Sequence, residues 1–112
     1  MEQKEIAWAE VPHPDYRDIK IRPIVIISNN VYNSKTEDVL ACAITSNTKA
    51  ADYSVYVDSN HLASGKLAFP SRIRADKLFF IKKTRILKSF GVLSNQKFDE
   101  LIKQIQLLIS RK

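Results

Sequence analysis

The sequence predicts a mainly-β domain that ends in one α-helix, and three patterns in the chain support this fold class. Short apolar runs rich in β-branched and aromatic residues, separated by polar residues, fill the region 5–81, which is typical of strands. Beyond residue 94 the apolar residues recur every three or four positions, which is typical of an amphipathic helix. The length of 112 residues and the 45% of hydrophobic residues suit one globular core, so we expect a single domain over residues 1–112.

The first three expected strands lie in the N-terminal half of the chain. The first covers residues 6–11 and ends at Pro12, because proline lacks the backbone donor that a sheet ladder needs. A basic loop is expected to continue from there to Lys20. The second strand, residues 24–27, is apolar without alternation, which indicates burial on both faces. The third covers residues 39–45 and leads into polar residues.

Three further strands are expected before the helix. Residues 53–57 alternate in polarity like a half-buried strand, and residues 85–92 would form the last strand of the sheet. Between them, a strand over residues 72–81 would bring its polar residues to one face, because side chains alternate across the pleat. These polar residues are Arg72, Arg74 and Asp76.

The C-terminal helix is predicted to begin after Ser94, whose side chain suits an N-cap. Apolar residues spaced by three and four positions fall on one face of a helix. The members of this stripe are Phe98, Leu101, Ile102, Ile105, Leu108 and Ile109.

Charge and cysteine usage restrict the partners and the compartment. A net charge of +6 and a pI of about 9.6 favour a polyanionic partner such as nucleic acid, although many mildly basic domains bind none. Cys42, the single cysteine, lies in an apolar run and is expected to pack in the core, which suits a reducing cytoplasm. Since the chain shows neither a signal-peptide pattern nor an uncharged run near the roughly 20 residues of a membrane span, we expect no membrane partner.

Cofactor and metal motifs are absent from the sequence. The chain contains no phosphate-binding glycine loop, no dinucleotide fingerprint and no His-Glu-x-x-His motif. Its two histidines, His13 and His61, are too few and too far apart for a convincing metal cluster. We therefore expect no cofactor and no metal, so that any chemistry is metal-independent.

Two features at strand ends are candidates for phosphate binding. Arg22 precedes Pro23 at the start of a buried strand, and a rigid guanidinium suits phosphate recognition, although a solvated strand-end arginine would look the same. Thr45, Ser46 and Asn47 follow an apolar strand and offer hydroxyl and amide donors, although such residues also form ordinary turns.

Two other features are candidates for proton transfer and for binding bases. Arg74 and Asp76 are neighbours on one strand face, where the carboxylate could accept a proton while the guanidinium stabilises charge, or they could form an ordinary surface ion pair. Cations and rings mixed in one loop can hold phosphates and stack bases, although a solvated loop is the alternative. The residues of this loop are His13, Tyr16, Arg17 and Lys20.

Several segments, taken in order along the chain, resemble the MazF/PemK family of toxins. Together they extend over nearly the whole sequence. They are Glu5-Ile6-Ala7-Trp8, Arg22-Pro23-Ile24-Val25-Ile26-Ile27-Ser28-Asn29, Tyr32-Asn33, Ala43-Ile44-Thr45-Ser46, Arg74-Ala75-Asp76-Lys77-Leu78 and the segment 86–94.

The resemblance implies an SH3-like small barrel with a C-terminal helix, of the kind shared by MazF and CcdB toxins, and a homodimer. It also implies sequence-specific, metal-independent cleavage of single-stranded RNA to 2′,3′-cyclic phosphate and 5′-hydroxyl ends. Arg22 and Thr45 would hold the scissile phosphate, Arg74 would assist its charge or the leaving oxygen, and Asp76 would take the proton of the attacking 2′-hydroxyl. Arg72 and the residues of the first loop would contribute to RNA binding. An acidic antitoxin would neutralise the toxin by folding across the RNA groove.

Two other functions are compatible with this strand pattern. A CcdB-type gyrase poison would share the barrel but would end its helix in a tryptophan-glycine-isoleucine tail. The present chain instead ends in Leu108-Ile109-Ser110-Arg111-Lys112. A non-catalytic SH3-like module that binds nucleic acid would need only the basic charge and the strands.

Overall fold

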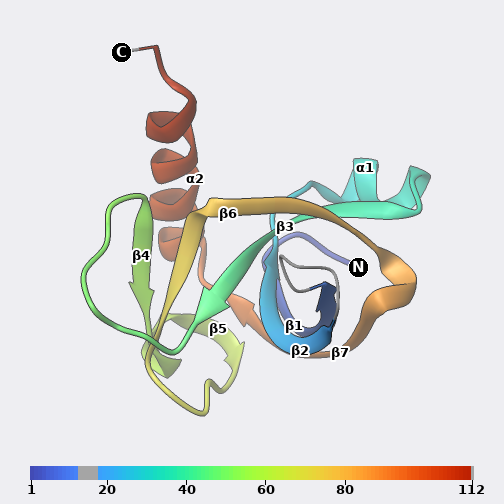
Figure 1. The fold of residues 1–112 in the computed structure, drawn as a ribbon, viewed down its shortest axis with the longest axis horizontal. Helices are drawn as coiled ribbons and strands as arrows, with labels where there is room; N and C mark the ends of the chain where they lie inside the picture. Colours follow the sequence, from blue (N-terminus) through green and yellow to red (C-terminus); the bar gives the residue numbers. More distant parts are fainter. Residues whose placement is uncertain (13–17, 112) are drawn as a thin grey trace.

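The computed structural model describes residues 1–12 and 18–111, which form an antiparallel sheet of seven strands and a long C-terminal helix (Figure 1). The strands are β1 (Glu5–Pro12), β2 (Ile19–Ile26), β3 (Asp38–Thr45), β4 (Ser54–Val57), β5 (Leu62–Gly65), β6 (Ser71–Lys82) and β7 (Ile86–Leu93). The helices are α1 (Asn30–Lys35) and α2 (Asn95–Ile109), and the short 3₁₀ turns are η1 (Ser59–His61) and η2 (Lys83–Arg85).

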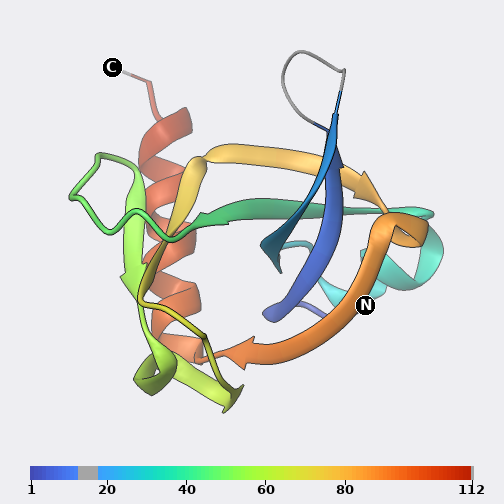
Figure 2. The ribbon, with the colours of Figure 1, turned by 60° about the horizontal axis from the view of Figure 1, so that its bottom comes forward.

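The strands are arranged in the order β4-β6-β3-β2-β1-β7-β5. The sheet curls strongly, and the long strand β6 bends where it passes from β4 to β3 (Figure 2). No ladder joins the edge strands β4 and β5 within the described residues, so the sheet is barrel-like without being closed. The predicted mainly-β class with a C-terminal helix is confirmed.

Both faces of the central strands are buried, as the apolar run of β2 predicted. Ile24 and Ile26 lie in one apolar cluster, with residues of β1, β3, β6 and β7. Val25 and the neighbouring Ile27 lie in a second cluster on the other face. This arrangement fixes the central strands on both sides, and the polar ends of β2, β3 and β6 extend beyond it.

Helix α2 covers the second apolar cluster, beside β4 and β6 (Figure 2). Ser94 is its N-cap and accepts a hydrogen bond of 3.2 Å from the backbone N–H of Lys97, as predicted. Leu101 is fully buried, whereas Leu108 and Ile109 at the end of the predicted stripe are exposed. The stripe is therefore longer than the sheet surface that it covers.

The structure differs from the sequence-based expectation at three places. Strand β2 begins at Ile19, so Lys20 belongs to a strand that pairs with β1 and not to a loop, and Arg22 lies inside this strand, opposite Ala9, and not at its start. Helix α1 was not expected, because it is too short to show a periodic stripe; its N-cap Asn29 accepts a hydrogen bond from the N–H of Tyr32. Strand β5 was also missed, because three of its four residues are exposed and carry no strand pattern.

Cys42 packs in the core, as predicted. It is fully buried. Burial, together with the negative charge of Asp76, raises the pKa of its thiol to about 12. The thiol is therefore protonated at neutral pH and contributes as a small apolar side chain.

Candidate functional site

A bulge in β6 shapes the candidate site. Cys42 of β3 is opposite Leu78 of β6, but the next residue, Ala43, is opposite Arg74, so residues 75–77 have no partner on β3. The backbone N–H of Ala75 donates instead to the carbonyl of Tyr53, at 2.9 Å. Bulges of this kind bend a strand and redirect its side chains. The bulge carries Asp76 and leaves it exposed.

Arg74 and Asp76 form a bidentate ion pair on β6. The Nε and Nη2 nitrogens of Arg74 donate to the two carboxylate oxygens of Asp76, at 2.8 and 2.6 Å. Each side chain is 30% exposed. The hydrogen bonds from Arg74 lower the pKa of Asp76 below its usual value, and the same bonds raise the pKa of Arg74. The carboxylate is therefore ionised at neutral pH, and the guanidinium is held in one orientation.

Arg22 of β2 and Thr45 of β3 line the same two cavities, just past the last pair of the β2–β3 ladder. Ile24 is opposite Ala43 in this antiparallel ladder. Two residues further in the same register come Arg22 and Thr45, beyond the last paired residues of the two strands. Thr45 is also opposite Arg72 on its other side, across the ladder with β6. Three neighbouring strands thus place two arginines, Arg22 and Arg72, around Thr45.

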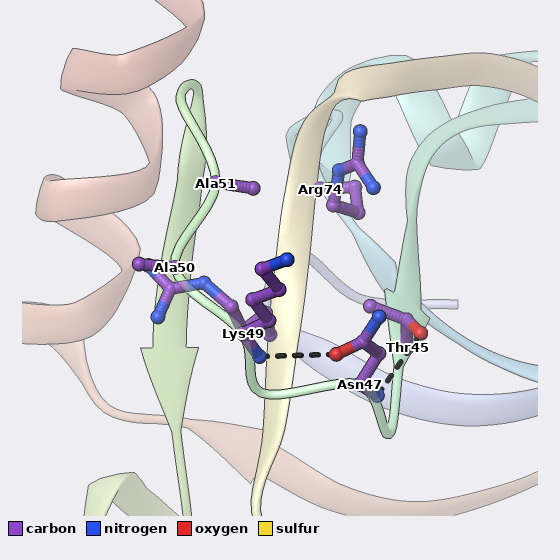
Figure 3. Close-up of a pocket in the computed structure, with 7 residues that line it drawn as sticks. Thr45, Asn47, Lys49, Ala50, Ala51 and Arg74 are labelled. Carbon is purple, nitrogen blue, oxygen red and sulfur yellow. Dashed lines mark hydrogen bonds between the residues drawn. The ribbon is translucent and has the colours of Figure 1, made fainter.

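The turn after β3 orients the Thr45 hydroxyl. The backbone N–H of Asn47 donates to Oγ1 of Thr45 at 3.2 Å, and the N–H of Lys49 donates to Oδ1 of Asn47 at 3.0 Å (Figure 3). A threonine hydroxyl that accepts a hydrogen bond still has its own proton to donate. Lys49 and Arg74 line the small pocket that opens above this turn.

All four predicted catalytic residues line one groove of about 560 Å³ between β2, β3 and β6. They are Arg22, Thr45, Arg74 and Asp76, and Lys20 lines the same groove. Such a groove combines cations, of which Arg74 is held in place by Asp76, with a hydroxyl donor and an ionised carboxylate. These groups can bind a phosphate, stabilise charge that develops on it, and accept a proton.

The predicted RNA-binding residues lie at several places around the groove. Asn47 and Arg72 line the small pocket next to it, where Nε of Arg72 donates to Ser54 Oγ at 2.8 Å. Ser46 lines a third cavity, which shares Arg22 and Thr45 with the groove. His13, Tyr16 and Arg17 lie outside the described residues.

Sequence reasoning missed Lys49 and the aromatic residues of the third cavity. Lys49 could have been found, because it closes the same polar turn as Asn47. The rings of Trp8, Phe69 and Phe90 come from three distant segments, so no local pattern connects them.

Within residues 1–12 and 18–111, no three His, Cys, Asp or Glu residues lie close enough together to hold a metal ion. His61 has a structural contact, because its Nδ1 accepts a hydrogen bond of 3.0 Å from the backbone N–H of Asp58 in the capping box of η1. Among the described helices, none is both long and apolar enough to cross a membrane.

A comparison with protein-family models gives one match over nearly the whole chain. Residues 2–109 match the family described as PemK-like, MazF-like toxin of type II toxin-antitoxin system. No curated protein sequence matches the chain significantly.

Solved structures with the same fold share few identical residues with the chain. MazF from Deinococcus radiodurans has a TM-score of 0.78 at 19% identity, with 97% of this chain and 96% of that chain covered. The Mycobacterium tuberculosis toxin MazF-mt6 has a TM-score of 0.75 at 23% identity, with 92% and 93% covered. A mycobacterial endoribonuclease in complex with its cognate antitoxin has a TM-score of 0.76 at 15% identity, with 100% and 99% covered. At these identities the structures establish the shared fold.

Proposed function

Since the chain belongs to the PemK-like, MazF-like toxins of type II toxin-antitoxin systems, we propose that it is an endoribonuclease that cuts single-stranded RNA. The observation that carries the proposal is the groove that Arg22, Thr45, Arg74 and Asp76 line together. The basic net charge of +6 supports a polyanionic substrate.

Cleavage would proceed by attack of a ribose 2′-oxygen on the adjacent phosphorus. The bond from phosphorus to the 5′-oxygen then breaks, which leaves a 2′,3′-cyclic phosphate and a 5′-hydroxyl. The 2′-hydroxyl loses a proton and the leaving 5′-oxygen gains one. This route needs charge stabilisation and proton transfer, which the side chains of the groove would supply without a metal. Asp76 would take the 2′-proton, and Arg74 would assist the charge on the phosphate or the leaving oxygen.

Arg22 and Thr45 would bind the scissile phosphate, because both line the groove and the cavity next to it. An arginine stays protonated at any working pH, so Arg22 would stabilise charge and would not transfer a proton. The Thr45 hydroxyl oxygen already accepts a hydrogen bond from the backbone N–H of Asn47. The hydroxyl proton would therefore be donated to a phosphate oxygen.

Asp76 would accept the proton of the 2′-hydroxyl after RNA has bound. In the free protein its two bonds to Arg74 keep it ionised but make it a weak base. A phosphate that draws Arg74 toward itself would remove one or both of these bonds, and the carboxylate would become more basic. Substrate binding and base activation would thus be coupled through Arg74.

An acidic antitoxin is the proposed inhibitor, and a homodimer the proposed assembly. Relatives with this fold include a mycobacterial endoribonuclease in complex with its cognate antitoxin and a MazE-MazF complex from Deinococcus radiodurans. An acidic, partly disordered peptide would satisfy the same cations as RNA.

Incubation of the pure protein with a long RNA in the presence of a chelator tests the proposal. We expect discrete cuts at a preferred sequence, with cyclic phosphate and 5′-hydroxyl ends. Activity that disappears with chelator and returns with magnesium or zinc would contradict the metal-free mechanism. A protein that binds RNA without cutting it would be a non-catalytic module.

A further inference from the structure

An aromatic cavity adjoins the catalytic groove. It has a volume of about 270 Å³ and shares Arg22 and Thr45 with the groove. Its apolar wall includes Trp8, Phe69 and Phe90. We call this cavity the aromatic pocket. The two cavities are therefore neighbours that share this arginine and threonine.

Two rings of the aromatic pocket form a stacked pair. Trp8 of β1 and Phe90 of β7 lie with their ring centroids 5.2 Å apart and their planes inclined by 29°. Trp8 is nevertheless 39% exposed, so part of its indole is free to contact a ligand. The pair is anchored on two adjacent strands, which makes it a rigid surface for stacking.

The third ring, that of Phe69, is exposed on a segment whose backbone is fixed by hydrogen bonds. Phe69 is 69% exposed, although large aromatic side chains usually bury most of their surface. Ser59 Oγ accepts from the N–H of Leu67 at 2.9 Å and donates to the carbonyl of Leu67 at 3.2 Å. Ser71 Oγ donates to the carbonyl of Phe69 at 2.9 Å. The segment thus fixes an exposed ring at the rim of the pocket.

We propose that the aromatic pocket binds one nucleobase next to the phosphate that Arg22 and Thr45 hold. The inference rests on the proposed function of the groove. In a nucleic acid each phosphate has a planar base within one nucleotide of it. The protein likewise has a cation in the groove and aromatic rings in the adjoining pocket. Stacking on aromatic side chains contributes to single-strand binding in a manner that tolerates different bases. The exposed hydroxyl of Ser46, also in the pocket wall, is able to bond a base edge.

The pocket contains its own reporter, because Trp8 is the single tryptophan of the chain. A base that stacks in the pocket would change the emission of Trp8. The first titration uses a mixed-sequence 2′-O-methyl RNA, which binds but cannot be cut because it lacks the attacking hydroxyl. We expect a saturable change in Trp8 emission, and no change with inorganic phosphate.

The decisive experiment compares base-containing and abasic RNA. The ligands are uncleavable 2′-O-methyl oligonucleotides that span the mapped cleavage site. In each oligonucleotide of the series, one base next to that site is replaced by an abasic position. For one position next to the cut, base removal should weaken binding to the wild type about tenfold but leave binding to Phe69→Ala unchanged, because the variant has already lost that contact. Phe69→Tyr keeps the ring and should retain the preference for the base.

Phe80→Ala is the matched control. Phe80 lies in β6, the strand that follows Phe69, and is 60% exposed. It packs against Tyr32, with ring centroids 6.4 Å apart, and does not line the aromatic pocket. This variant should bind both kinds of oligonucleotide like the wild type. Melting temperatures verify that each variant is folded.

The proposal is wrong if base removal weakens binding equally in the wild type and in Phe69→Ala at every position, or if saturating RNA leaves Trp8 emission unchanged. An inhibitor peptide that changes Trp8 emission where RNA does not would assign the pocket to a protein ligand. If the wild type cuts RNA but gives such results, the proposed function stands and only the assignment of the aromatic pocket to a base is rejected. A wild type that never cuts RNA contradicts the proposed function, and the first titration still decides on the pocket.

Discussion

Arg74 donates to both carboxylate oxygens of Asp76 from the same strand, at 2.8 and 2.6 Å, across the bulge in β6. A hydrogen-bonded pair at the surface usually contributes at most about 1 kcal/mol to stability. The pair is therefore expected to matter more for the reaction than for the fold, and each partner can be tested separately.

Replacing Asp76 with Asn should lower the rate of RNA cleavage by about 10²- to 10⁴-fold, because the amide keeps the shape of the side chain but cannot accept the proton. The melting temperature should change little. Single-turnover kinetics at saturating enzyme would measure the chemical step directly. A rate within a few-fold of the wild type would remove Asp76 from proton transfer and leave it as a partner that orients Arg74.

Acid should destabilise the protein through Asp76 only at low pH. Its folded-state pKa is lowered by Arg74, so its contribution to stability is present above its ordinary pKa of about 3.9 and is lost as the pH falls through the lower folded value. Denaturant midpoints of the wild type and Asp76→Asn should therefore differ slightly at pH 6 and approach each other as the pH falls below about 4. A constant difference down to pH 2 would show that the lost ion pair is not its cause.

The thiol of Cys42 should resist alkylation in the folded protein. It is fully buried, and its pKa of about 12 leaves almost no thiolate at pH 8. Iodoacetamide should modify it only after denaturant unfolds the chain, as mass spectrometry would show. Rapid modification of the native protein would mean that β3 opens locally.

An acidic inhibitor peptide should exclude RNA from the groove. Both ligands would need the cations at Lys20, Arg22 and Arg74, so their binding should be competitive and should weaken steeply with added salt. Fluorescence anisotropy of labelled RNA, titrated with the peptide at two salt concentrations, measures both effects. A ternary complex of protein, RNA and peptide with unchanged affinities would show that RNA and peptide bind at different sites.

The sequence was sufficient to predict most strands of the sheet and α2, because these elements show local periodicity. Residues 24–27 and the stripe around Leu101 showed their burial directly in the order of apolar residues. The extension of β2 back to Ile19 was not predictable in this way, because that part of the strand is exposed and is specified by its pairing with β1.

The candidate site was predictable as a set of residues but not as a geometry. That Arg72, Arg74 and Asp76 belong to one strand follows from alternation. The bulge at residues 75–77 depends on how β6 pairs with β3 and β4, which no local pattern encodes. The aromatic pocket could not be predicted from the sequence for the same reason, because Trp8 and Phe69 are brought to one cavity only by the topology of the sheet.

Arg22→Ala and Thr45→Ala should abolish cleavage while leaving the fold intact. Arg22 is exposed and Thr45 lies at the end of β3, so each replacement should change stability by about 0.5 kcal/mol or less. Loss of a donor that stabilises charge at a reacting centre typically raises the barrier by about 3 to 4 kcal/mol, or about 10²- to 10³-fold in rate. The two effects are therefore separable by measuring melting temperature and cleavage rate on the same samples. Arg22→Lys and Thr45→Ser are the matched controls. The lysine keeps the charge but loses the planar fork and should recover little activity if the phosphate contact is bidentate, whereas the serine keeps the hydroxyl and should recover most of it. If Arg22→Ala cuts RNA at the wild-type rate and melts at the wild-type temperature, Arg22 is merely a solvated residue of β2 and the phosphate must bind elsewhere.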